Sequence, residues 1–271
     1  MNKKILFITP EFYPTNGGVA NAAMKFAEAL VSNGYFVEVI TVVNENNFTE
    51  KEDYKNIVIY RINYKKNPVW GNIKKIRWIY FALKSLLIIK KSKPDIIFGQ
   101  TILEGGVISA TAGLLMRRLS IVHGHGTDVD LLKKSAGVER ILNLFSLNYN
   151  DIVLATNNDF KNKMQLFSRK EVLILRNIVH IPELSFSKMD AKKNLHLRED
   201  KFQILFVGRL IEIKGIKDLL EAMLKISDSV LNIFGAGELE DYIRNFIKEN
   251  KMDGAINIYG KVSNERIAEF M

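Results

Sequence analysis

Four side chains that can bind a metal or move a proton lie in one short segment. The segment SIVHGHGTDVD (120–130) holds His123, His125, Asp128 and Asp130 directly after a short apolar run. Two histidines followed by aspartates resemble the HxHxDH arrangement of metallohydrolases, in which such side chains bind divalent cations. The same residues could instead place one histidine at the end of a strand, where it would face a substrate.

A metal centre in this segment would need further ligands from elsewhere in the chain. The other two histidines are His180 and His196, neither of which lies in a recognisable ligand motif, and there is no cysteine. The lack of cysteine excludes a disulfide framework, a zinc ribbon and a Cys nucleophile, and it fits a reducing cytoplasm. We therefore expect no bound metal, and we interpret the Asp-x-Asp spacing as chance.

The elements that must position these residues follow an alternating pattern. Short apolar runs of strand type alternate with longer stretches of helical spacing, which is typical of a parallel sheet covered on both faces. The predicted strands are 4–9, 36–43, 57–62, 95–100, 120–125, 151–156, 171–175, 202–210, 230–237 and 256–260. The predicted helices are 19–34, 73–93, 105–117, 216–226, 239–250 and a last one from 263.

The pattern stops and restarts across a polar segment, 185–201. The 271 residues therefore predict two doubly wound α/β units, 1–180 and 181–271. The second series has only three strands, and the sequence stops within the predicted last helix. We expect the second unit to be incomplete.

Charge is distributed unevenly between these two units. Residues 1–180 contain 25 Lys and Arg against 15 Asp and Glu, whereas residues 181–271 contain 14 against 15. Such asymmetry suggests an anionic partner for the first unit, although a Lys-rich compositional habit would give the same numbers. The apolar run at the N-terminus is too short for a signal peptide or a membrane span.

Three glycine-containing loops follow predicted strands, where open α/β sheets bind ligands. Gly17 and Gly18 precede a helix and would let the backbone approach a phosphate, although an ordinary tight turn would look the same. Gly208 ends a strand and is followed by Arg209 and Lys214. Two cations near a helix N-terminus suit a diphosphate, but solvated surface cations are the common alternative.

The third loop is IFGAGELED, in which Gly235-x-Gly237 follows a strand. The spacing is similar to the start of a dinucleotide-binding fingerprint, but Glu240 stands where the third glycine belongs. An NAD-dependent enzyme is therefore disfavoured, and a loop beside another nucleotide fits equally well.

Taken together, the segments VGRLIEIKGI, IFGAGELED, IYGKVSNERIAEFM, PxxGG and HGTDV resemble the blocks of family 4 glycosyltransferases, in the same order. The resemblance extends over the whole chain. It implies a GT-B architecture of two Rossmann-like domains, with the acceptor side in the first domain and a nucleotide-sugar donor in the cleft between them. It also implies transfer with retention and without a catalytic metal or other cofactor.

The resemblance assigns roles residue by residue. Arg209 and Lys214 would hold the donor diphosphate and stabilise the leaving nucleotide. His125 would face the transferred sugar, and Asp128 beside it would organise the loop. Strand alternation is expected to turn His123 to the other face, as a structural residue. The remaining donor-binding positions that the resemblance implies are Gly17, Gly18, Gly208, Gly235, Gly237 and Glu238.

Two departures from the family pattern affect these expectations. Of the usual Pro-Asn-Gly after the sixth strand, RNIV (176–179) keeps only Asn177. The paired glutamates that grip the donor should follow IAEFM, where the sequence stops. We expect this chain by itself to bind donor weakly or not at all and to transfer sugar poorly; detectable turnover would contradict that expectation.

The sequence thus predicts a retaining glycosyltransferase that acts on a cell-surface glycan or lipid-linked precursor. The alternative is a non-catalytic binding or scaffold protein of the same fold. The basic helix 73–93 is either a core-packing helix with solvated lysines or a docking element for an anionic membrane. A cytoplasmic protein at the inner face of the plasma membrane is expected. Nucleic acid is not expected as a partner, because no aromatic-interleaved basic motif occurs.

Overall fold

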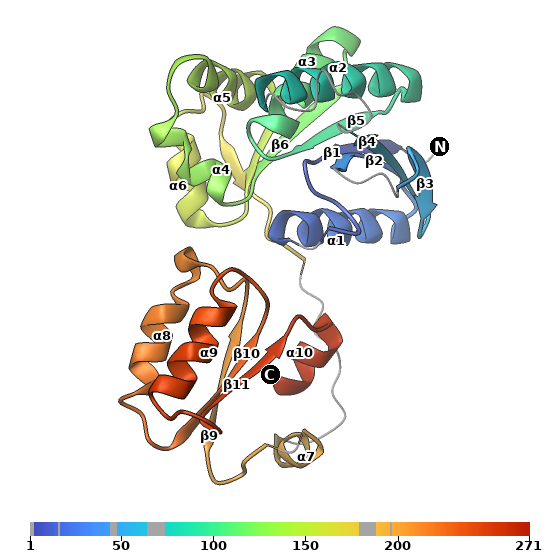
Figure 1. Ribbon diagram of the computed structural model, residues 1–271. Helices are drawn as coiled ribbons and strands as arrows, with labels where there is room; N and C mark the ends of the chain where they lie inside the picture. Colours follow the sequence, from blue (N-terminus) through green and yellow to red (C-terminus); the bar gives the residue numbers. More distant parts are fainter. Residues whose placement is uncertain (1–2, 16, 44–47, 64–73, 179–187, 196) are drawn as a thin grey trace. The chain divides into compact units, whose positions relative to one another are not determined.

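The computed structural model describes residues 3–15, 17–43, 48–63, 74–178, 188–195 and 197–271. The chain divides into two compact units, Met1–Val179 and His180–Met271, and the division falls next to the predicted boundary at residue 180 (Figure 1). Each unit has its own sheet and its own hydrophobic core. The predicted α/β class with two Rossmann-like units is confirmed.

Unit 1 (Met1–Val179) is built on an eight-stranded sheet in the order β3-β4-β2-β1-β5-β6-β7-β8. All neighbouring strands are parallel except the antiparallel pair β3–β4. The strand order reverses beside β1, which is the position where open α/β sheets bind ligands. The strands are β1 Lys4–Ile8, β2 Phe36–Val43, β3 Lys51–Tyr54, β4 Ile57–Asn63, β5 Ile96–Gln100, β6 Leu119–Gly124, β7 Ile152–Ala155 and β8 Val172–Ile174.

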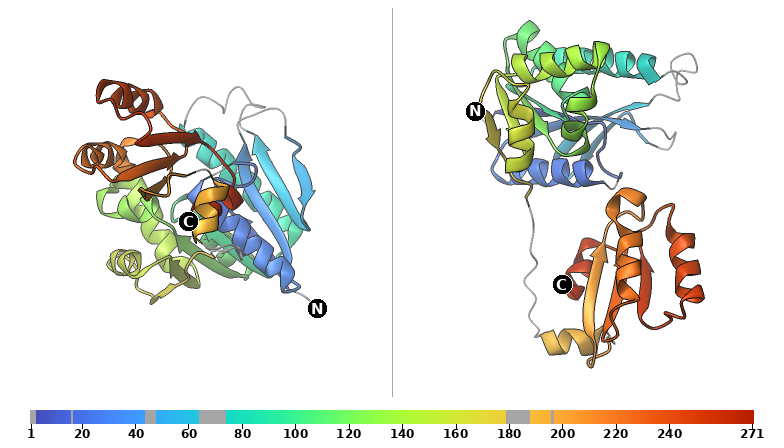
Figure 2. Two further views of the ribbon diagram at one scale, coloured as in Figure 1. Left: turned by 90° about the horizontal axis from the view of Figure 1, so that it is seen from below. Right: turned by 90° about the vertical axis from the view of Figure 1, so that its left-hand side faces the viewer.

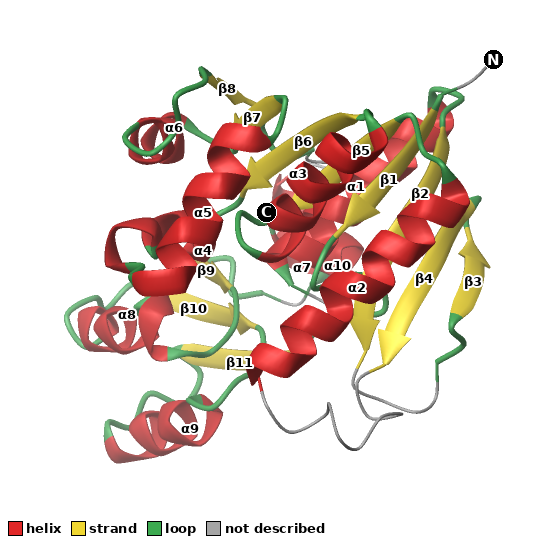
Figure 3. Cartoon of the chain, turned by 90° about the horizontal axis from the view of Figure 1, so that it is seen from above, coloured by secondary structure: helices red, strands yellow, loops and turns green. Residues whose placement is uncertain are grey.

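Helices bury both faces of this sheet. In β1, Ile5 and Phe7 join the core with α1, whereas Leu6 and Ile8 join the core with α2 and α3. Side chains of a strand alternate between faces, so a strand that is apolar at every position must be covered on both. Figure 3 shows α2, α3 and α5 over one face of the sheet. The helices are α1 Gly18–Ser32, α2 Lys74–Ser92, α3 Glu104–Met116, α4 Thr127–Asp130, α5 Gly137–Tyr149 and α6 Asn158–Gln165.

Some of these elements were not predicted from the sequence. β3, with the sequence KEDY, contains no apolar run because it is an edge strand that pairs on one side only. It is stabilised by its neighbours, since the ring of Tyr54 stacks on that of Tyr13 with centroids 4.1 Å apart. The helices α4, α5 and α6 were also missed.

Unit 2 (His180–Met271) contains a three-stranded parallel sheet in the order β11-β10-β9. Helices α8 and α9 cover one face, and α10 lies on the other, as Figure 2 shows. On that second face the ring of Phe270 contacts those of Phe234 and Tyr259, with centroids 4.7 and 5.2 Å apart. The elements are α7 Lys188–Asn194, β9 Phe202–Val207, α8 Ile216–Met223, β10 Ser229–Phe234, α9 Glu240–Glu249, β11 Ile256–Gly260 and α10 Asn264–Phe270.

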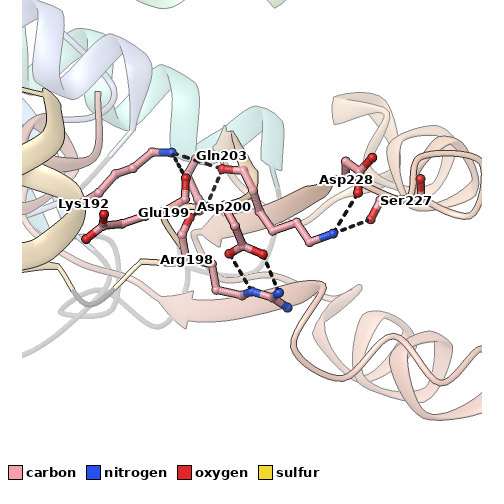
Figure 4. Close-up of polar contacts among 8 residues, drawn as sticks. Lys192, Arg198, Glu199, Asp200, Gln203, Ser227 and Asp228 are labelled. Atoms are coloured by element: carbon pink, nitrogen blue, oxygen red, sulfur yellow. Dashed lines mark hydrogen bonds and ion pairs between the residues drawn. The ribbon is translucent and has the colours of Figure 1, made fainter.

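The segment that leads into β9 is fixed by polar contacts, which Figure 4 shows. Lys192, at the end of α7, donates from Nζ to the carbonyl oxygens of Glu199 and Lys201, both at 3.2 Å. This helix lies inside the segment that was predicted only as a polar separator. These hydrogen bonds to residues just before β9 help to order a segment of low hydrophobicity.

Candidate functional site

The candidate site in unit 1 is formed by the carboxyl ends of β1, β5 and β6. These three strands are consecutive neighbours in the sheet, so the loops that follow them lie side by side. They lead into the Gly17–Gly18 turn, the residues from Thr101 onward, and the His125–Asp128 turn. In the register of β5 with β6, Gln100 lies directly opposite His123.

Asp128 holds two of these loops together. Its Oδ1 accepts hydrogen bonds from the backbone N–H groups of His125 at 3.1 Å and Gly126 at 2.8 Å. Its Oδ2 accepts a third one from the N–H of Ile102, in the loop after β5, at 3.1 Å. A carboxylate engaged by three N–H donors is well suited to fix a loop and poorly suited to act as a free base.

His125 lies at the end of β6 with one ring nitrogen in contact with the chain. Its Nε2 makes a short hydrogen bond with Oε1 of Gln100. Burial lowers the pKa of His125 to about 4, although the neighbouring Asp128 acts in the opposite direction. The imidazole is therefore neutral at physiological pH and offers one donor and one acceptor.

His123 lies beside His125, and the prediction that it turns to the other face is wrong. The two rings lie 4.1 Å apart between centroids, because residues two apart along an extended strand share a face. The expectation that His123 is structural agrees with its surroundings: it is fully buried, and its Nε2 donates to the carbonyl oxygen of Leu175 at 3.1 Å. Burial, and then the neighbouring His125, lower its pKa to about 3.

Gly17 and Gly18 form the start of α1, and the chain itself does not require glycine at either position. A Cβ on Gly18 would have nothing within 4 Å, and one on Gly17 would meet only the flexible carboxylate of Glu11. The turn lies at the N-terminus of α1, where free backbone N–H groups and the helix dipole favour an anion. Contact with a donor at this turn stays a prediction.

In unit 2, Arg209 and Lys214 lie in the loop between β9 and α8, and both side chains are exposed. Among the described residues, neither makes a side-chain hydrogen bond or ion pair, whereas the nearby Lys217 pairs with Glu212 at 2.7 Å. A Cβ on Gly208 would touch only the ring of Phe206, at 3.7 Å, so this glycine is also not required by packing. The loop thus presents two unengaged cations beside an uncrowded backbone.

Gly235 and Gly237, by contrast, are required by the packing of unit 2. A Cβ on Gly235 would lie 1.8 Å from the carbonyl oxygen of Gly208, and one on Gly237 would lie 2.4 Å from that of Leu210. Gly235 also has a φ of +145°, which L side chains rarely adopt. Glu238 follows them as an exposed residue. These two glycines have a structural explanation, whether or not a nucleotide lies near them.

The metal alternative gains no support from the described ranges, in which no three His, Cys, Asp or Glu side chains gather as ligands. Asp130 points to Lys163, whose Nζ donates to its Oδ1 at 2.8 Å. His180 and His196 lie outside the described residues, and Asn177 is exposed.

Gln100 is the site residue that the sequence did not reveal. It is fully buried and contacts His125, yet its residue type and position mark it only as the polar end of an apolar strand. The cross-strand register with β6, which could have indicated it, becomes visible only once the strand order is known.

Two relatives match most of the chain at low identity. A glycosyltransferase of Methanocaldococcus jannaschii that has not been characterised is 26% identical, over 89% of this chain and 65% of its own length. The alpha-monoglucosyldiacylglycerol synthase of Acholeplasma laidlawii is 22% identical, over 97% of this chain and 71% of its own length. The chain therefore spans about two thirds of the length of these curated relatives.

Similar folds are also found among solved structures. One is HepE of Anabaena in complex with UDP-glucose, which superposes with a TM-score of 0.71 at 15% identity, over 99% of this chain and 71% of HepE. Residues 16–181 match the family described as Glycosyltransferase Family 4, and residues 187–271 match Glycosyl transferases group 1. With both units covered by these matches and with the fold agreeing, the chain belongs to the family 4 glycosyltransferases of the GT-B fold.

Proposed function

We propose that this protein transfers a sugar, with retention, from a nucleotide-diphosphate sugar to a glycan or a lipid-linked acceptor. The observation that supports this most directly is the pair Arg209 and Lys214, two exposed cations next to the N-terminus of α8 that have no side-chain partner within the described part of the chain. A diphosphate would supply the negative counter-charge for both cations, and the helix dipole would favour its binding further.

The chemistry of the proposed transfer follows from these groups. As the bond between the sugar and the diphosphate breaks, negative charge grows on the departing phosphate, and two fixed cations stabilise that charge. No metal is needed for this step in the proposal. The three N–H donors on Asp128 also favour retention, because an inverting route would need a free base to activate the acceptor.

Donor binding by single variants tests the proposal. In ligand-detected NMR with UDP-glucose, Arg209→Ala and Lys214→Ala should each weaken binding about 10- to 100-fold, the loss expected for a charge-assisted hydrogen bond. Lys217→Ala is the matched control, since its charge is already paired with Glu212, and it should change binding less than about threefold.

Equal effects of all three substitutions would indicate nonspecific attraction and contradict the assignment of the diphosphate site. UDP, ADP and GDP sugars compared in the same experiment would identify the donor base. Binding of a donor without any transfer, by a chain that also carries the paired glutamates, would instead favour the non-catalytic alternative.

We further propose that α2 brings the protein to an anionic membrane at the inner face of the plasma membrane. One face of this helix packs in the core through Phe81 and Ile89, as the core-packing alternative requires. The opposite side exposes Ile79, Leu83 and Leu87 at a spacing of four residues, and their exposed fractions are 45%, 56% and 63%. Core packing does not explain this second apolar ridge.

Lysines accompany the exposed ridge, notably Lys84, Lys90 and Lys91. An apolar ridge with basic neighbours fits the surface of an anionic bilayer. The described part of the chain has no helix suited to crossing one. The name of the Acholeplasma laidlawii relative refers to a glycosylated diacylglycerol, which supports a lipid acceptor.

Vesicle sedimentation tests the membrane proposal. The chain should bind vesicles that contain phosphatidylglycerol and leave neutral phosphatidylcholine vesicles largely unbound. Replacing Leu83 and Leu87 together by Ser should reduce the bound fraction about tenfold or more. Each leucine that enters the bilayer contributes about 1.5 kcal/mol or more of binding free energy, and this contribution would be lost. Leu166→Ser is the matched control, since Leu166 is similarly exposed, at 69%, at the end of α6. Equal binding to both vesicle types would argue against the proposal.

A further inference from the structure

Gln100 lies next to the carboxyl end of β6, in a position that its residue type alone does not explain. It is the last residue of β5 and is fully buried. Its Oε1 contacts Nε2 of His125, and its own Nε2 has no hydrogen-bond partner among the residues that the structure describes. Burying an amide whose nitrogen has no hydrogen-bond partner lowers the stability of the fold. The contact of Gln100 with His125 therefore needs a functional explanation.

The two histidines of this cluster differ in which ring nitrogen is open. Nδ1 of His123 is buried and has no hydrogen-bond partner in the described ranges. Nδ1 of His125 also makes no hydrogen bond within the described residues, but it is not among the buried atoms that lack a partner. With Nε2 engaged by Gln100, Nδ1 is therefore the nitrogen of His125 that remains open to solvent.

The contact with Gln100 also determines where the single proton of the neutral imidazole lies. A carbonyl oxygen can only accept a hydrogen bond, so the partner nitrogen must hold the proton. His123 follows this rule through the backbone oxygen of Leu175. By the same rule, the amide oxygen of Gln100 selects the Nε2–H form of His125, and its Nδ1 is left with a lone pair.

We propose that Gln100 is a positioning residue that holds His125 as the Nε2–H tautomer and presents Nδ1 as a hydrogen-bond acceptor for a hydroxyl group of the donor sugar. That the hydroxyl group belongs to a donor sugar rests on the proposed glycosyltransferase function. The tautomer itself does not, since it follows from contacts within unit 1. Gln100 need not touch the substrate, because it acts through His125.

The tautomer can be measured directly on the 271-residue chain. With only four histidines, ¹⁵N-histidine labelling gives a simple spectrum in which protonated and unprotonated ring nitrogens are well separated. At pH 7, His125 should be at least about tenfold enriched in the Nε2–H form, the ratio that one hydrogen bond can produce. A predominant Nδ1–H form in the unmodified protein would overturn the proposal.

Two substitutions at Gln100 separate positioning from packing. Gln100→Leu removes the acceptor and should bring the two tautomers of His125 to comparable populations. Gln100→Glu keeps an acceptor and should keep Nε2 of His125 protonated. His123 serves as an internal reference, and Gln165→Leu, in α6, is a matched control that should leave His125 unchanged. An unaltered tautomer ratio in Gln100→Leu would contradict the proposal.

Addition of donor distinguishes this inference from the proposed function. UDP-glucose should shift the Nδ1 resonance of His125, whereas UDP, which lacks the sugar, should not. Binding of UDP-glucose that leaves Nδ1 unaffected would contradict the assigned role of this nitrogen. No response to either compound by a chain that also carries the paired glutamates would contradict the proposed function, while the tautomer measurement would still decide the positioning role of Gln100.

Discussion

The loop after β6 in unit 1 and the loop after β9 in unit 2 both follow the carboxyl end of a strand, but their polar side chains are engaged differently. In the first, the carboxylate of Asp128 takes three backbone N–H groups, and the ring of His125 is held by Gln100. In the second, Arg209 and Lys214 extend from the chain with no partner among the described side chains. The first loop is completed by contacts within unit 1, including two with residues of β5 and the loop after it. The second loop presents its positive charge to solvent or to a ligand.

This difference separates two kinds of binding contact. A loop that is fixed before the ligand arrives can orient a sugar without a further loss of conformational entropy. Exposed cations contribute charge and attraction, but they must be ordered when the ligand binds. Substitutions in the first loop should therefore change stability most, and those in the second should change ligand affinity most.

The largest expected effect on stability comes from Asp128→Ala. Three N–H groups would lose their acceptor, and the free energy of unfolding should fall by about 3 kcal/mol. Both tryptophans of the chain belong to unit 1, so tryptophan fluorescence during urea denaturation reports on that unit. Asp130→Ala is the control, because its exposed pair with Lys163 is worth less than about 1 kcal/mol. Similar midpoints for the two variants would contradict the conclusion that Asp128 holds the loop after β6 in place.

A smaller loss is expected from a change at a glycine in unit 2. Gly235→Ala forces a Cβ against the carbonyl oxygen of Gly208 and should destabilise the unit by about 2 kcal/mol. Gly208→Ala meets no such contact and should leave stability within about 0.5 kcal/mol while weakening donor binding. Hydrogen exchange of the β9 and β10 amides measures the stability of unit 2 in both variants. Equal protection in the two variants would show that the contrast between these glycines is wrong.

The smallest expected effect is the pH dependence of the free energy of unfolding that comes from His123, at the end of β6. The pKa of His123 is lowered by burial to about 3, below its ordinary value of 6.5, so the unfolded chain binds the proton first. Stability is therefore complete above pH 6.5 and falls as the pH drops toward 3. Between pH 7 and 5 this residue should account for about 1–2 kcal/mol.

The variant His123→Phe keeps a ring beside Phe26 and Phe98 but removes the titration. Its unfolding free energy, measured in urea at several pH values, should decline less steeply from pH 7 to 5. His125 would still contribute in the same direction, because its pKa is lowered as well. An unchanged slope would mean that His123 is not the buried neutral group described here.

Much of the fold could be predicted from the sequence, because its signals are local. Ten strands were expected and found, since continuous apolar runs bounded by turns identify buried parallel strands. The edge strand β3 was missed because KEDY is not apolar, and its pairing with β4 depends on a tertiary contact. The helix α7 was missed because it is held by contacts with the segment just before β9.

The candidate site was predictable in its residue types and less so in its geometry. The loop-organising geometry of Asp128 matches the expectation, and the three hydrogen bonds give the reason. The expected orientation of His123 was wrong, because residues two apart share a strand face. The role of Gln100 was not visible, since it depends on β5 and β6 being neighbours in the sheet.

By itself, the sequence determined the class of the fold, the two-unit organisation and the family, because apolar periodicity and short glycine-containing blocks are properties of consecutive residues. Only the tertiary structure decided which glycines serve packing and which leave the backbone open. It also decided that His125 is held by Gln100 and that Arg209 and Lys214 find no side-chain partner in the ranges that the structure describes. Those distinctions depend on contacts between residues far apart in the chain, and such contacts exist only after the strands have taken their order.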